Sequence, residues 1–299
     1  MIFSKISVCF WYNEQVMKAF LECISCIIRQ TIEILRRIVR SEKKRQRILA
    51  AVIGKMAKVD IHKMSPPEAT KYAHDEIQRI TGIKDLYKEP KKQNNREALQ
   101  LYPYLKRLVR KARDPLLMAV RLAIAGNIID YGALAEFDIK HTVKDVLGKK
   151  FAVSDYKRFR RDLKKTKLLL YIGDNAGEIV FDRVLIEELI KKIEVVFVVK
   201  SKPVLNDVLM EDAKMVGLDK VVKVIKSGSD FAGTIPSKGT KEFKELYKSA
   251  EMVISKGQGN FETLDQEKKN IYFLLKMKCP SLGRVTGFKA GDIILKRSR

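Results

Sequence analysis

Residues 167–178 have the sequence KLLLYIGDNAGE, and this stretch indicates the fold class most clearly. A short apolar run ends at Gly173, and the polar turn Asp-Asn-Ala-Gly-Glu follows at once. A run of this length is typical of a strand buried on both faces, and such a turn is where the next helix begins. The stretch therefore predicts one strand-to-helix unit of an α/β protein.

Further short apolar runs follow, separated by segments with helical periodicity. The runs are 194–199 (EVVFVV), 220–225 (KVVKVI), 250–254 (AEMVI) and 271–275 (IYFLL), and the helical segments are 182–192, 204–216 and 241–248. Strands alternating with helices predict the α/β class, with a parallel sheet and helices on both faces.

The first half of the chain has the periodicity of helices. Helices are expected over 20–40, 43–57, from Ser65 to Gly82, 99–113 and 115–125, with a polar loop over 84–95 that contains Pro90. We therefore expect a helical N-terminal region over 17–150 and an α/β domain over 151–299. Residues 1–16 form a possible extension, since Met17 is an alternative start.

Composition narrows the class of protein. The 299 residues include 60 Lys and Arg against 36 Asp and Glu, a net charge of +24, and 46% are hydrophobic. This charge favours anionic partners, although a basic surface without a specific partner explains it as well. Four cysteines argue against a secreted disulfide scaffold, and no apolar run reaches the length of a membrane span. We expect a cytoplasmic protein without membrane contact.

Ligands of such sheets bind beyond the carboxyl ends of the strands, so the residues there are candidates for a site. Asp174, Asn175 and Asp207 offer the hard oxygen ligands that suit magnesium or manganese. Lys256 and Lys278 could neutralise charge on a transferring phosphoryl group. Gly177, Gly257 and Gly259 permit tight turns around an anion.

Each of these residues also has a plainer interpretation. Asp174 and Asn175 could cap the following helix, and Asp207 could be a solvated helix residue. Lys256 and Lys278 could be surface lysines. Their joint occurrence at successive strand ends favours a site.

These motifs, in their order, resemble the archaeal and prokaryotic branch of the domain-of-unknown-function-89 family, also called metal-dependent damage-control phosphatases. The matching motifs are 173–178 (GDNAGE) with 181–182 (FD), 200–207 (KSKPVLND), 255–262 (SKGQGNFE), 275–279 (LKMKC), 22–30 (ECISCIIRQ) and 126–130 (GNIID). The resemblance extends from Met17 to about Asp292. It implies a helical N-terminal region on a Rossmann-like α/β metal-binding domain over 151–299, with a mostly parallel sheet.

The resemblance implies a phosphatase of small phosphomonoesters, such as sugar phosphates or related damaged or surplus phosphorylated metabolites. It implies a divalent metal, Mn²⁺ or Mg²⁺ with Co²⁺ or Ni²⁺ as further options, on Asp174, Asn175 and Asp207. The residues that it implies for substrate binding are Asn127, Gly177, Lys256, Gly257, Asn260 and Lys278. Leu275-Lys276 replaces the Arg-Thr pair of eukaryotic relatives, so their substrate preference need not apply.

The chemistry that follows is a hypothesis with two versions. The metal lowers the pKa of a water, and Lys256 and Lys278 stabilise the phosphoryl oxygens. Either Asp174 attacks phosphorus, or Glu178 or Asp207 orients the water. The sequence leaves both versions open, together with the oligomeric state.

Other signals carry less weight. Cys23 and Cys26 are spaced as half of a zinc site but lie on an expected helix, where two partly buried thiols are the plainer interpretation. An S-adenosylmethionine-dependent methyltransferase is one alternative function, but the turn at 173–178 lacks a G-x-G. A basic nucleic-acid-binding protein is the other, and no nucleic-acid motif supports it.

Overall fold

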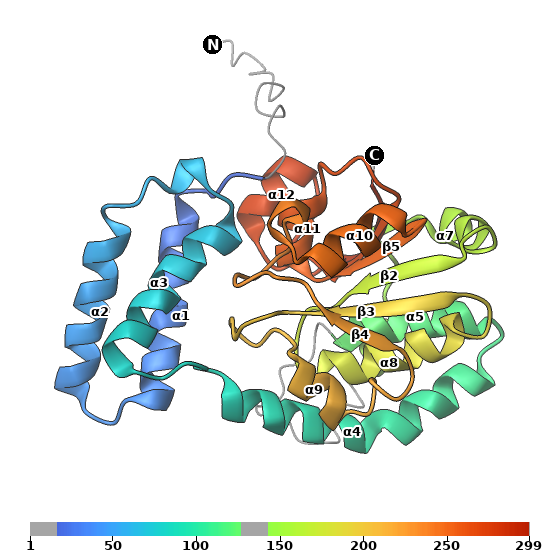
Figure 1. Cartoon of the computed structure of the whole chain (residues 1–299), viewed down its shortest axis with the longest axis horizontal. Coiled ribbons are helices and arrows are strands. Elements are labelled where there is room, and N and C mark those ends of the chain that lie inside the picture. Colours follow the sequence, from blue (N-terminus) through green and yellow to red (C-terminus); the bar gives the residue numbers. More distant parts are fainter. Residues whose placement is uncertain (1–16, 127–142, 299) are drawn as a thin grey trace, which may run out of the picture.

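The computed structural model describes residues 17–126 and 143–298, and these form a seven-stranded sheet. The strand order is β1-β7-β6-β5-β2-β3-β4, parallel except for the antiparallel pair β6–β7. The strands are β1 (Val153–Ser154), β2 (Leu168–Ile172), β3 (Glu194–Val199), β4 (Lys223–Lys226), β5 (Met252–Lys256), β6 (Ile271–Lys276) and β7 (Ile293–Arg297). This confirms the predicted α/β class (Figure 1).

Helices surround the sheet and extend to one side of it. They are α1 (Glu22–Ile38), α2 (Glu42–Met56), α3 (Pro66–Thr81), α4 (Lys88–Lys111), α5 (Pro115–Gly126), α7 (Tyr156–Leu163), α8 (Glu178–Leu189), α9 (Met210–Met215), α10 (Lys241–Ser249), α11 (Gln258–Leu264) and α12 (Pro280–Thr286). Short 3₁₀ turns lie at Ile61–Lys63 and Pro236–Lys238. Helices α1–α5 make up the helical N-terminal region that the sequence predicts.

Alternate residues of the central strands belong to two separate apolar cores, one on each face of the sheet. On β2, Leu169 and Tyr171 belong to a core that α4, α5 and α8 complete. Leu170 and Ile172 belong to a second core, which Phe243 of α10 and other residues of α10–α12 complete. Successive residues of a strand point to opposite faces of the sheet, and helices cover both faces, so residues on both faces are apolar. The strands therefore appear in the sequence as continuous apolar runs without alternation.

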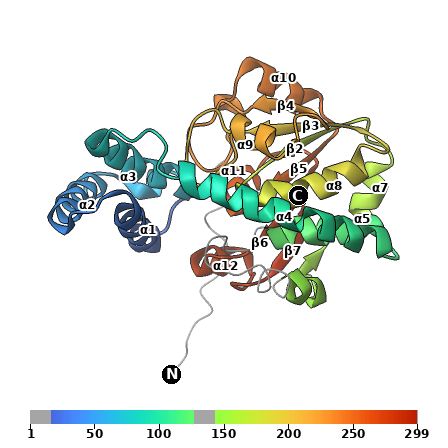
Figure 2. The same cartoon turned by 90° about the horizontal axis from the view of Figure 1, so that it is seen from below.

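Helices α1–α3 form a bundle with its own apolar core, beside the sheet (Figures 1 and 2). Ion pairs join this bundle to the α/β part: Glu22 with Arg284, Glu68 with Lys238 at 2.8 Å, and Lys71 with Asp230 at 3.5 Å. Helix α3 begins at the Ser65 capping box and ends at Gly82, which has φ of 74°, as its sequence predicts.

Three details of the sequence prediction are wrong. Residues 84–95 are not a loop, because α4 begins at Lys88 and Pro90 lies in its first turn, where the missing N–H costs nothing. The segment 204–216 is helical only over α9. Strands β1 and β7 were not predicted, since β1 has two residues and β7 carries its apolar residues in only three positions. The expected division of the chain into 17–150 and 151–299 stays a prediction.

Within residues 17–126 and 143–298, no helix has the length and apolar character that crossing a membrane requires.

Candidate active site

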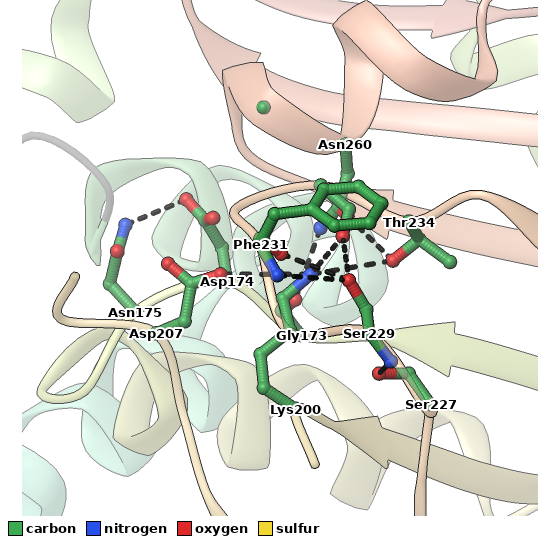
Figure 3. Close-up of polar contacts among 12 residues, drawn as sticks. Gly173, Asp174, Asn175, Lys200, Asp207, Ser227, Ser229, Phe231, Thr234 and Asn260 are labelled. Carbon is green, nitrogen blue, oxygen red and sulfur yellow. Dashed lines mark hydrogen bonds and ion pairs between the residues drawn. The ribbon is translucent and has the colours of Figure 1, made fainter. Parts of the chain in front are cut away.

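The predicted metal-binding residues lie together at the carboxyl ends of β2 and β3. The loops that carry them pair through an isolated bridge between Asn175 and Asp207. The amide of Val208 donates to the carbonyl of Asp174 at 2.8 Å, and the amide of Ala176 donates to the carbonyl of Asn206 at 2.9 Å. Backbone pairing therefore holds the three side chains in one place, as Figure 3 shows.

Carboxyl groups crowd this place. The Asn175 amide donates to Asp174 Oδ2 at 2.6 Å and to Glu178 Oε2 at 3.3 Å. Burial, and then the nearby charges of Glu178 and Asp207, raise the pKa of Asp174 well above its ordinary value. Burial raises the pKa of Asp207 to about 6. Both aspartates therefore hold their protons more tightly than an exposed carboxyl group would.

Lys200, which the sequence analysis did not single out, stands beside Asp207. Its ammonium lies 3.6 Å from Asp207 Oδ2 and donates to the carbonyl of Gly233. Burial lowers the pKa of Lys200, and the charge of Asp207 opposes that fall. Its place within KSKPVLND was the available signal, but nothing in the sequence distinguishes it from the neighbouring Lys202.

Lys256 lies deeper than the sequence suggests, with a fully buried side chain. Its ammonium donates to the carbonyl of Ala123 at 2.8 Å, to Asp182 Oδ1 at 2.6 Å and to Glu178 Oε1. An ammonium has three N–H donors, so these partners use all of them. The geometry favours Lys256 as a residue that positions Glu178 over one that touches a phosphate.

The Asp174 carboxyl group packs against the backbone of Gly257. Its φ is +78°, and a Cβ added to it would lie 1.9 Å from Asp174 Oδ2. No side chain fits at that separation, so the glycine is needed for both its backbone angle and its missing side chain.

Replacing Gly257 with alanine is expected to lower the rate of phosphate release about 100-fold, because Asp174 must move by an ångström or more. Gly54→Ala is the matched control, since a Cβ there meets no atom within 4 Å and the residue lies within α2. It should leave the rate unchanged and stabilise the protein slightly. Equal rates for the two variants in a phosphate-release assay would refute this function of Gly257.

Two further candidates have structural partners that occupy their polar groups. The Asn260 amide donates to the carbonyls of Gly173 at 3.1 Å and Lys256 at 2.8 Å, which joins the ends of β2 and β5. The amide of Gly177 donates to Asn95 Oδ1 at 2.7 Å. The amide groups of Asn260 and Gly177 therefore already donate to protein oxygens. Their assignment as substrate ligands stays a prediction.

Asn95 is a second residue that the sequence analysis missed. It lies in α4, accepts from Gly177 and donates to Asp212 Oδ1 at 2.8 Å. The sequence analysis missed Asn95 because it expected a loop over 84–95. Through Asn95, the helical region supports the turn that begins α8.

Lys278 is exposed, and its charge acts to lower the pKa of Asp174. It follows β6, so this candidate does converge on the same edge of the sheet. Asn127 lies outside the described residues. The Cys23 thiol accepts from the amide of Phe20 at 3.4 Å, and burial raises its pKa to about 11, whereas Cys26 is exposed.

Comparisons with known proteins identify the family of this chain. A sequence profile of the damage-control phosphatase ARMT1-like domain matches residues 19–294, so the chain belongs to this family of phosphatases. Among its relatives is the damage-control phosphatase PH1575 of Pyrococcus horikoshii, which is 32% identical over 95% of this chain and 99% of the relative.

A second relative and a solved structure extend the match. The uncharacterized protein MJ0202 of Methanocaldococcus jannaschii is 36% identical over 96% of this chain and 98% of its own length. The crystal structure of PH1575, described as a DUF89 family protein, superposes with a TM-score of 0.88 and covers 95% of this chain and all of that one. The resemblance drawn from the motifs is therefore confirmed.

Proposed function

We propose that this phosphatase hydrolyses small phosphomonoesters, sugar phosphates or related damaged or surplus metabolites, with a divalent cation on Asp174, Asn175 and Asp207. The observation that carries the proposal is the meeting of Asp174 and Asp207 beside Asn175 and Glu178, where burial raises the pKa of both aspartates and the charges of Glu178 and Asp207 add to the rise at Asp174. A bound cation would favour the ionised form of both carboxyl groups.

The donor set suits a hard cation. Asp207 Oδ2 is buried and accepts no hydrogen bond from the described part of the chain. The proposed ligands are two carboxylates and one amide. The described residues contain no group of three or more His, Cys, Asp and Glu that could hold a metal ion. A site with few protein ligands, completed by water and phosphate oxygens, is typical of Mg²⁺ and Mn²⁺ rather than of a structural zinc.

A bound cation would lower the pKa of a water molecule and would place positive charge beside the phosphate oxygens. Lys278 is an exposed lysine that follows β6 at this edge, and in this proposal it binds the phosphate group. Glu178, held by Lys256, fixes the Asn175 amide. The attack on phosphorus has two versions. In one, Asp174 is the nucleophile, and in the other, Asp207 or Glu178 orients the attacking water.

Phosphate release from a panel of phosphomonoesters tests the function. We expect release that EDTA abolishes and that Mn²⁺, Mg²⁺, Co²⁺ or Ni²⁺ restores to different extents. Absence of release with every ester and metal would overturn the proposal. The stereochemical course at phosphorus separates the two versions, because a single attack by water inverts the configuration, whereas attack by an aspartate followed by attack of water on the phosphoryl-enzyme retains it.

Stability of the EDTA-treated protein should depend on the protonation of Asp207. Its folded-state pKa of about 6 exceeds the ordinary 3.8, so the folded state holds the proton more tightly and this stabilisation is lost as pH rises from about 4 to about 6. Relative to Asp207→Asn, the wild type should lose about 3 kcal/mol of unfolding free energy over this range.

Urea unfolding of both proteins at several pH values in EDTA measures this difference. Adding Mn²⁺ at pH 7 should stabilise the wild type and leave Asp207→Asn nearly unchanged, because the ion binds the folded state. Parallel pH profiles of the two proteins in EDTA would contradict the assignment.

A further inference from the structure

The backbone of Lys278 is held by one side chain, that of Gln258. Gln258 Oε1 accepts the amide of Lys278 at 3.0 Å and the amide of Cys279 at 3.1 Å. Gln258 is the first residue of α11, directly after Gly257. The same short turn therefore touches Asp174 through Gly257 and Lys278 through Gln258.

A buried carboxyl group sets the orientation of this amide. Gln258 Nε2 donates to Glu262 Oε1 at 2.8 Å, one helical turn further along α11. Because the NH₂ group faces Glu262, the carbonyl oxygen of Gln258 faces the two backbone amides. Burial raises the pKa of Glu262 to about 7, and the hydrogen bond from Gln258 opposes this rise.

We infer that Gln258, oriented by Glu262, is a positioning residue that sets the distance between Lys278 and Asp174 during phosphate hydrolysis. The inference deepens the proposed function and rests on it. An exposed lysine on a coil after β6 would otherwise sample many positions, and the two hydrogen bonds restrict its backbone. Both polar atoms of the Gln258 amide bind protein groups, so this residue acts through Lys278.

A double-mutant cycle tests this dependence. Gln258→Ala should lower kcat about tenfold in the wild-type background and less than twofold in the Lys278→Ala background. Gln266→Ala is the control, since this half-buried glutamine donates only to the adjacent Asp265 among the described residues and should change kcat less than twofold. Equal effects of Gln258→Ala in both backgrounds would overturn the inference.

An exchanged pair provides the conservative rescue. Gln258→Glu alone keeps an acceptor for the two amides but sets two carboxyl groups against each other. Adding Glu262→Gln restores a donor opposite that acceptor, so the double variant should recover at least half of the wild-type kcat. A double variant no better than Gln258→Glu would contradict the role given to Glu262.

Hydrogen–deuterium exchange separates this inference from the proposed function. In Gln258→Ala, the peptide that contains Lys278 and Cys279 should exchange faster, while β5 and β6 keep their protection. Faster exchange in a protein that releases no phosphate would overturn the function but support the contact. Unchanged exchange in an active phosphatase would overturn the inference alone.

Discussion

Replacing Asp174 with alanine is expected to reduce phosphate release about 1,000-fold or more. The substitution removes a carboxylate that lies against Gly257 and beside Asn175, where the proposed cation requires it. The fold should persist, because burial and neighbouring charges already disfavour the ionised carboxylate in the metal-free protein. The measurement is the initial rate with the best ester and metal, together with thermal unfolding.

Asp219→Ala is the control for this prediction, since Asp219 is an exposed aspartate that precedes β4 by a few residues. It should keep the wild-type rate. A rate above a tenth of the wild-type value for Asp174→Ala would show that hydrolysis occurs elsewhere.

Replacing Lys256 with methionine is expected to destabilise the protein by about 3–5 kcal/mol. The change leaves the carboxyl groups of Glu178 and Asp182 buried without the ammonium that both contact. Tyr171 still donates to Asp182 Oδ1 at 2.7 Å, but a neutral hydroxyl offsets little of that charge. Denaturant unfolding gives the free energy directly.

Lys244→Met, on the exposed side of α10, should change stability by less than about 0.5 kcal/mol. Adding Glu178→Gln and Asp182→Asn to Lys256→Met should recover part of the loss, since no buried charge then lacks a partner. A loss below about 1 kcal/mol for Lys256→Met alone would mean that the three charges are not coupled.

The sequence predicts the sheet well because each central strand is buried on both faces. Such strands appear as continuous apolar runs, and the runs at 194–199 and 271–275 match β3 and β6 within a residue. Strand β7 was missed because its apolar run covers only three residues, 293–295, and its last two residues are Lys296 and Arg297.

The sequence also predicts which loops lie together at the candidate site, because strand ends of a parallel sheet meet at one edge. It does not show how deep each side chain lies. Lys256 and Lys278 look alike in the sequence, yet one is fully buried among carboxyl groups and the other is exposed. Asn95 and Gln258 support the site through contacts over 82 and 20 residues, which no local pattern reports.

Binding of Mn²⁺ tests the central claim most directly. The paramagnetic resonance signal of free Mn²⁺ is recorded while wild type, Asp174→Ala and Asp219→Ala are titrated at pH 7. We expect saturable binding of about one ion per chain by the wild type and Asp219→Ala, and its loss in Asp174→Ala. Saturable binding that Asp174→Ala retains in full, or none by the wild type, would contradict a metal site on Asp174, Asn175 and Asp207.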